Sequence, residues 1–236
     1  MNRLDGRVVA IAGAAGGLGP TVAGTLADLG ARLALTDVQQ GRLDELVATL
    51  GVPEDRVDAR VVDLLDEGAT RAWAAAVTER FGGVDAVAHL VGGWRGGQGL
   101  GDAPLEDWAL LHDLLIRTVQ HTSRAFLAAL KASDHGRFVL ISAAAAAHPT
   151  STNAAYASAK AAAEAWTIAL ADELAPTAAT ANIVTVNAIL TPRLRDENPD
   201  KEYRTFTSAE DIAQAIAFLL SDAAAKMNGK RLALHP

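Results

Sequence analysis

The chain has 236 residues, of which 50% are apolar, and its net charge is −7. These values are typical of a globular protein with one large domain or two small ones. The acidic balance disfavours a nucleic-acid partner, and the absence of cysteine excludes disulfides, thiol nucleophiles and Cys-ligated metals. We find no signal-peptide pattern and no apolar run of about 18 residues, so we expect a cytoplasmic protein without a membrane partner.

Short apolar runs alternate with longer helical patterns along the whole chain. The predicted strands cover 7–12, 32–36, 56–62, 84–91, 136–142, 181–190 and 230–234. The predicted helices cover 20–29, 41–50, 66–81, 104–131, 153–174 and 208–220, with a polar loop over 191–207. This alternation favours parallel strands joined by right-handed crossovers, and no linker divides the chain. We therefore predict a single α/β domain over 1–236, with a doubly wound (Rossmann), mostly parallel, seven-stranded sheet.

A glycine-rich turn separates the first predicted strand from the first helix. Glycines 13, 17 and 19 form a GxxxGxG pattern that also contains Leu18. Glycine lets backbone N–H groups approach a pyrophosphate, and the N-terminus of the following helix attracts the anion. An isolated pattern of this kind also describes a tight strand–helix connection. Its position after the first strand favours a dinucleotide site that includes Gly13, Gly17, Leu18 and Gly19.

Acidic residues follow the next two predicted strands. Asp37 ends the second strand, where a carboxylate can accept hydrogen bonds from an adenosine ribose and would repel a 2′-phosphate. No arginine stands directly beside Asp37, so we expect NAD as the cofactor and regard NADP as less favoured. Asp63 and Leu64 follow the third strand and suit an adenine edge, although an ordinary helix cap explains them equally well.

Tyr156 and Lys160 stand four residues apart in the helical pattern 153–174. Residues at this spacing share one face of a helix. An ammonium group beside a phenol favours the phenolate, so we expect Lys160 to lower the pKa of Tyr156 and make it a better acid–base group. The only other tyrosine, Tyr203, has no such partner.

Together these motifs resemble the short-chain dehydrogenase/reductase family. The glycine turn, Asp37, the Asp63-Leu64 pair and the Tyr156/Lys160 pair follow one another at the family spacing. The resemblance implies hydride transfer with a nicotinamide cofactor, with Tyr156 as proton donor and Lys160 on the cofactor ribose. It also implies cofactor contacts at Gly92 and Thr191, and a homodimer or homotetramer built on the helices 104–131 and 153–174.

The chain departs from the family pattern at the positions that assist the tyrosine. Ala143 stands where the family usually has a catalytic serine, and Leu115 stands where it has an asparagine. Ser142 is one residue early, and because strand side chains alternate, we do not expect it to substitute. The loop 92–97, with its GGWxGG pattern, is similar to that of dihydropteridine reductases, which also lack the serine.

This second resemblance implies an NADH-dependent reductase of a small, electron-poor, conjugated acceptor. Trp94 would lie beside the nicotinamide, where a flat ring could stack on it, although a residue that anchors the loop explains it equally well. His148, in the loop after the fifth of the seven strands, could contact a polar substrate, and the alternative is a solvated loop histidine. Two alternatives stay open: a general short-chain alcohol dehydrogenase or ketone reductase, and a dinucleotide-binding protein without turnover. We expect His89 to be a buried core residue, and the histidine spacings indicate no metal site.

Overall fold

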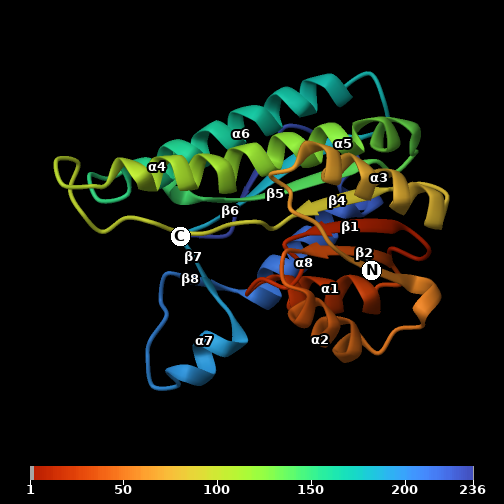
Figure 1. Ribbon diagram of the computed structural model, residues 1–236, viewed down its shortest axis with the longest axis horizontal. Coiled ribbons are helices and arrows are strands. Elements are labelled where there is room, and N and C mark those ends of the chain that lie inside the picture. The colour runs from red at the N-terminus through yellow and green to blue at the C-terminus, as the bar shows by residue number, and fades with distance from the viewer. Residues whose placement is uncertain (1–2, 236) are drawn as a thin grey trace.

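The computed structural model, which describes residues 3–235, has a seven-stranded parallel sheet at its centre (Figure 1). The strand order is β3-β2-β1-β4-β5-β6-β9, which confirms the predicted doubly wound fold. The strands of this sheet are β1 Val8–Ala12, β2 Arg32–Asp37, β3 Val57–Val61, β4 Ala86–His89, β5 Arg137–Ala143, β6 Thr180–Val186 and β9 Arg231–Ala233. Two further strands, β7 Ala188–Leu190 and β8 Phe206–Ser208, pair with each other outside it.

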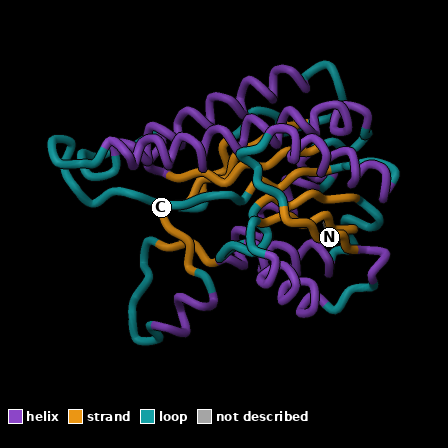
Figure 2. Tube along the Cα trace, viewed as in Figure 1, coloured by secondary structure: helices purple, strands orange, loops and turns teal. Residues whose placement is uncertain are grey.

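Helices cover both faces of the sheet, as Figures 1 and 2 show. The helices are α1 Gly19–Asp28, α2 Gln40–Leu50, α3 Glu67–Phe81, α4 Leu105–His112, α5 Thr118–Ala132, α6 Ala154–Leu174, α7 Pro192–Glu197 and α8 Ala209–Leu220. One core lies under α1, α2 and α8, and the other lies under α3, α5 and α6. Among residues 3–235, none of the helices combines the length and the apolarity that a membrane crossing requires.

The alternation of side chains along each strand builds these two cores. In β1, Val9 and Ile11 pack into the core with α1 and α8, whereas Val8 and Ala10 pack into the opposite core. Because both faces are covered, the strand is apolar at every position, as parallel strands usually are. The sheet is therefore a rigid frame whose strand ends are held in fixed positions.

The predicted strand 181–190 divides at Asn187. Strand β6 pairs with β5 up to Val186, which lies opposite Ala143, the last residue of β5. Beyond that point the large sheet offers β6 no partner, so the next residues turn away and Ala188 pairs with Phe206 of β8. The side chain of Asn187 donates a hydrogen bond to the carbonyl of Thr205 (3.3 Å), which anchors the turn.

The predicted helix 104–131 is interrupted by a π-helical segment, Asp113–Arg117, between α4 and α5. A π turn adds one residue to the helical repeat, and the apolar periodicity of the sequence does not reveal it. The hydroxyl of Thr118 donates to the carbonyl of Leu114 within this segment (2.7 Å). Leu114 and Thr118 consequently face the same cavity, which is described below.

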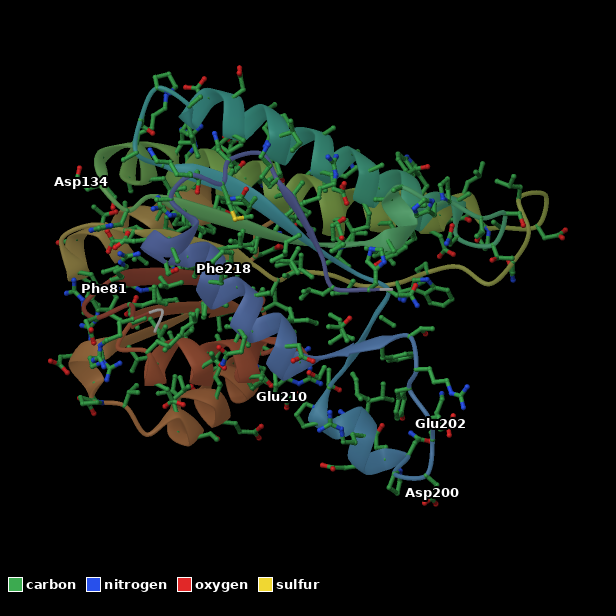
Figure 3. The ribbon with its side chains drawn as sticks, turned by 180° about the vertical axis from the view of Figure 1, so that it is seen from behind. Phe81, Asp134, Asp200, Glu202, Glu210 and Phe218 are labelled. Atoms are coloured by element: carbon green, nitrogen blue, oxygen red, sulfur yellow. The ribbon has the colours of Figure 1, made fainter. Side chains whose placement is uncertain are left out.

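The predicted polar loop 191–207 contains the short helix α7 and projects from the body of the protein (Figure 1). Thr191 caps this helix by accepting a hydrogen bond from the Leu194 N–H. The Tyr203 hydroxyl donates to the Leu194 carbonyl (3.0 Å), which ties the returning chain to α7. Asp200 and Glu202, labelled in Figure 3, lie on the outer edge of this projection and point away from the sheet.

Candidate active site

A cavity of about 780 Å³ lies at the carboxyl ends of the strands of the large sheet. Most of the residues predicted from the sequence line it, namely Gly13, Gly17, Leu18, Asp37, Asp63, Leu64, Gly92, Trp94, Tyr156, Lys160 and Thr191. Gly19 is buried at the start of α1, behind the lining. His148 is exposed, and the structure does not bring it to this cavity. Ligands of doubly wound proteins bind at this edge of the sheet.

The glycine turn leaves a cradle that side chains would fill. Gly13 has a φ of +80°, and a Cβ there would lie 3.0 Å from the Val91 backbone nitrogen. A Cβ on Gly19 would lie 2.0 Å from the Ala14 carbonyl oxygen, so only glycine fits where α1 begins. Within the described chain, the N–H groups of Gly17 and Leu18 have no hydrogen-bond partner. Two free donors at a helix N-terminus fit a pyrophosphate.

The carboxylate of Asp37 is held at the end of β2. Its Oδ2 accepts a hydrogen bond from the Ala15 N–H (3.1 Å), and its Oδ1 accepts one from the Val38 N–H (2.8 Å). Asp63, after β3, accepts a hydrogen bond from the Leu65 N–H (2.9 Å) and so closes a local turn. Both carboxylates thus have fixed positions in the wall of the cavity.

Lys160 is buried, and its ammonium donates to the Ile141 carbonyl on β5 (2.9 Å). Burial lowers the pKa of Lys160 to about 8, although the nearby charge of Glu164 acts in the opposite direction. The Nζ atom lies 5.9 Å from the centroid of the Tyr156 ring, over its face.

The pKa of Tyr156 departs from the sequence-based expectation. Burial raises the pKa of this phenol above its ordinary value, whereas the helix spacing predicted that Lys160 would lower it. The reason is that the ammonium points to the Ile141 carbonyl and lies over the ring face. The phenol is therefore protonated at neutral pH.

Ser142 lines the cavity, but its hydroxyl is bound to a residue outside the lining. It donates to Oε1 of Glu164 on α6 (2.6 Å), and Oε2 of the same carboxylate accepts from Arg231 Nε (2.6 Å). Ala143, the next residue of β5, is buried and has no polar side-chain atom. No sequence motif includes Glu164, and its position one helical turn after Lys160 is the signal that points to it.

His89 is a fully buried residue behind the cavity wall, as predicted. Its Nε2 lies 3.2 Å from the Thr118 hydroxyl, whose only hydrogen already goes to the Leu114 carbonyl, so Nε2 carries the proton and donates. The other ring nitrogen, Nδ1, is buried and has no partner in residues 3–235. Burial, reinforced by the charge of Lys160, lowers the pKa of His89 to about 3, so its ring is neutral.

Trp94 stands at the open side of the cavity and is 56% exposed. The loop that carries it is anchored to the approach of α6, because the Gly97 N–H donates to the Thr152 carbonyl (2.8 Å). A Cβ on Gly96 would lie 3.1 Å from Cζ2 of the indole, so the glycine backbone packs directly against the ring. The indole therefore contacts Gly96, lines the cavity and stays more than half exposed.

Comparison with known proteins decides the family. The family model described as "Enoyl-(Acyl carrier protein) reductase" matches residues 13–234. The chain belongs to the short-chain dehydrogenase/reductase family. As an oxidoreductase of this family it has a fold that binds nicotinamide dinucleotides, which agrees with the cradle at Gly17 and Leu18.

Individual relatives support the same assignment. A 2,3-dihydro-2,3-dihydroxybenzoate dehydrogenase from Bacillus subtilis is 30% identical, and the match covers 92% of this chain and 90% of the relative. A short-chain dehydrogenase from Burkholderia cenocepacia, solved in complex with NADP, is 28% identical with a TM-score of 0.86, covering 99% and 98% of the two chains. A short-chain type dehydrogenase/reductase from Mycobacterium ulcerans has the same fold, with a TM-score of 0.90 at 23% identity, covering 98% of this chain and 89% of that one.

Proposed function

We propose that this short-chain dehydrogenase/reductase is an NADH-dependent reductase of a small, electron-poor, conjugated acceptor, similar to dihydropteridine reductases. One observation carries the proposal. Ser142 and Thr118, two hydroxyl groups that line the cavity, both donate elsewhere, to Glu164 and to the Leu114 carbonyl. Tyr156, which also lines the cavity, is the hydroxyl group to which we assign the proton transfer to the acceptor.

An acceptor that is polarised by one proton donor alone must accept hydride readily. The loss of one positioned donor to a developing oxyanion typically lowers the rate by a factor of about 10²–10³. A conjugated, electron-poor ring such as a quinonoid dihydropterin needs less polarisation than a simple ketone, so it tolerates that loss. The supported indole of Trp94 adds a flat apolar surface on which such a ring can stack.

The proposed roles of the residues follow from their positions. Gly17 and Leu18 would bind the pyrophosphate, Asp37 the adenosine ribose, and Lys160 the ribose next to the nicotinamide. The bound cofactor supplies the hydride, and the acceptor gains that hydride together with one proton. Tyr156 gives the proton from its phenol, which its raised pKa keeps protonated, and the resulting phenolate recovers a proton from solvent.

We propose NADH over NADPH because of Asp37. Its carboxylate is fixed by the Ala15 and Val38 N–H groups and lies in the cavity wall, where a 2′-phosphate would meet a negative charge. The same hydrogen bonds prevent the carboxylate from swinging away from the site. Measurement of kcat/KM with NADH and NADPH tests this preference directly.

The proposed function is tested by following NADH oxidation with quinonoid dihydropterin and with a series of simple ketones. We expect turnover with the dihydropterin and little with ketones. The variant Tyr156→Phe should lower kcat by about 10²-fold or more while NADH binding is kept. Tyr203→Phe is the matched control, because Tyr203 donates to Leu194 in the projection and does not line the cavity. Activity on ketones alone would exclude the dihydropterin assignment.

A general dehydrogenase is the second candidate, and the Bacillus subtilis relative favours it. That relative is named as a dehydrogenase of a dihydroxy-dihydro acid and is 30% identical to this chain. This candidate predicts reduction of NAD by a cyclic diol or another secondary alcohol, in the direction opposite to the first proposal. A panel of alcohols with NAD separates the two. Tight cofactor binding without turnover in either direction would favour a dinucleotide-binding protein without catalysis.

We also propose that the protein is a cytoplasmic homodimer or homotetramer. Support comes from the outer surface of α4, where Leu105 is 84% exposed and Leu110 is 45% exposed. Large apolar side chains grouped on one helix mark surfaces that other protein chains cover. Light scattering coupled to size-exclusion chromatography measures the mass, and a monomer at micromolar concentration would contradict the proposal.

A further inference from the structure

We propose that Glu164 is a positioning residue that holds the Tyr156–Lys160 face of α6 against the end of β5. This inference rests on the proposed function of Tyr156 and Lys160, and it adds a residue that holds these two side chains in position. Glu164 belongs to α6, one helical turn beyond Lys160, and only 4% of it is exposed. It does not line the cavity, so it acts through its neighbours.

Two neighbouring residues of β5 are joined to two residues of α6 that stand one turn apart. The Lys160 ammonium donates to the Ile141 carbonyl (2.9 Å), and the Ser142 hydroxyl donates to Oε1 of Glu164 (2.6 Å). One bond runs from the helix to the strand and the other from the strand to the helix. These two buried hydrogen bonds, at successive residues of β5, fix the rotation of α6 about its axis and its position along β5. Tyr156 lies one turn earlier on α6, so its direction is fixed with them.

A cation, Arg231, pairs with the carboxylate of Glu164. Arg231 on β9 donates from Nε to Oε2 (2.6 Å), and the Arg231 side chain is 50% exposed. The arginine therefore keeps much of its hydration, while the buried carboxylate has partners at both oxygens. Glu164 thus connects α6, β5 and β9 behind the cavity. Ser142, which the family pattern leaves without a role, is one of the members of this connection.

Glu164 also sets the electrostatic surroundings of Lys160. Burial lowers the pKa of Lys160 to about 8, and the negative charge of Glu164 raises it against that effect. The other groups that face Lys160 are neutral, since His89 on β4 has a pKa of about 3 and the Tyr156 phenol has a raised pKa. Arg231 stands behind Glu164 and partly offsets its charge. Without Glu164, Lys160 would lose its proton at a lower pH.

The central experiment compares Glu164→Gln with Glu173→Gln. Glu173 is on the same helix, exposed, and paired with Lys131, so it is a matched control. NADH affinity is measured by fluorescence titration from about pH 6 to about pH 10, and kcat/KM is measured over the same range. Binding should weaken at alkaline pH as Lys160 loses its ammonium. In Glu164→Gln we expect the midpoint of this alkaline loss to fall by about one pH unit, with no change in Glu173→Gln.

Two further variants separate the effect of the Ser142–Glu164 hydrogen bond from the effect of the Glu164 charge. They also provide a test if Glu164→Gln does not fold. Ser142→Ala removes the hydrogen bond and keeps the carboxylate, so kcat should fall several-fold while the alkaline midpoint stays where it is. Arg231→Gln removes the compensating cation from a half-exposed site, so the midpoint should move upward. Opposite shifts in Glu164→Gln and Arg231→Gln are the result that a merely structural role does not produce.

The outcomes also distinguish this inference from the proposed function. Failure of the wild-type protein to bind NADH, or to reduce any acceptor, refutes the proposed function. Wild-type binding and turnover, with a Glu164→Gln profile that coincides with that of Glu173→Gln, refutes the positioning role alone. If Glu164→Gln does not fold, Arg231→Gln decides, and a midpoint that stays or falls in that variant overturns the inference.

Discussion

His89 should make the folded protein lose stability in mild acid. The ring is fully buried, its Nδ1 has no partner among the described residues, and its pKa is lowered from 6.5 to about 3. The unfolded chain binds a proton at His89 below about pH 6.5, whereas the folded protein does not until about pH 3. Between these values the unfolded state holds more protons, so stability is present above the unfolded pKa and falls as the pH falls.

The size of the loss follows from the same two values. Between about pH 7 and about pH 5 the linkage relation gives a loss of ~2 kcal/mol for one such histidine. This figure depends mainly on the unfolded pKa, because the folded pKa of about 3 lies well below the whole interval. A loss of ~2 kcal/mol is a substantial part of the free energy of unfolding of a typical domain.

The measurement is urea unfolding at about pH 7 and about pH 5, followed by circular dichroism. His89→Asn removes the titrating ring and keeps a polar side chain, and His148→Asn is the control, because His148 is exposed. Other groups titrate equally in all three proteins, so the differences between them isolate His89. We expect the wild type and His148→Asn to lose ~2 kcal/mol more than His89→Asn. Equal losses in all three would refute this account of His89.

Three further predictions concern the site itself. Gly19→Ala places a Cβ 2.0 Å from the Ala14 carbonyl oxygen and should weaken NADH binding by about tenfold or more. Its control is Gly24→Ala in α1, where a Cβ meets nothing within 4 Å; this variant should leave binding unchanged and stabilise the helix by about 1 kcal/mol. Asp37→Ser should reduce the NADH-to-NADPH ratio of kcat/KM by about tenfold, and an unchanged ratio would remove Asp37 from cofactor selection. Ala143→Ser should raise the NADH-dependent reduction of simple ketones, and no gain would show that the absent serine does not limit this reaction.

The sequence by itself determined the fold class and most of the residues that the structure brings together in one cavity. Alternating strands and helices leave few topologies, and the observed seven-stranded parallel sheet is doubly wound, as they indicate. Gly13 and Gly19 were recognisable because their constraint is local, a left-handed backbone at one and a missing Cβ at the other. Tyr156 and Lys160 were recognisable because helical spacing alone puts them on one face. These features depend on residues close together in the chain, so a pattern can reveal them.

The tertiary structure decided the features that depend on distant partners. Ser142 meets Glu164 across 22 residues, and Glu164 meets Arg231 across 67, so the direction of the Ser142 hydroxyl has no local signature. The pKa of Tyr156 is raised because the phenol is buried, and burial is produced by the whole fold. Likewise the division of the predicted strand at Asn187 arose because β5 ends at Ala143 and leaves no partner beyond it. Spacing therefore identified the candidate reacting groups Tyr156 and Lys160, whereas packing between distant segments determined their contacts and the directions of their pKa shifts.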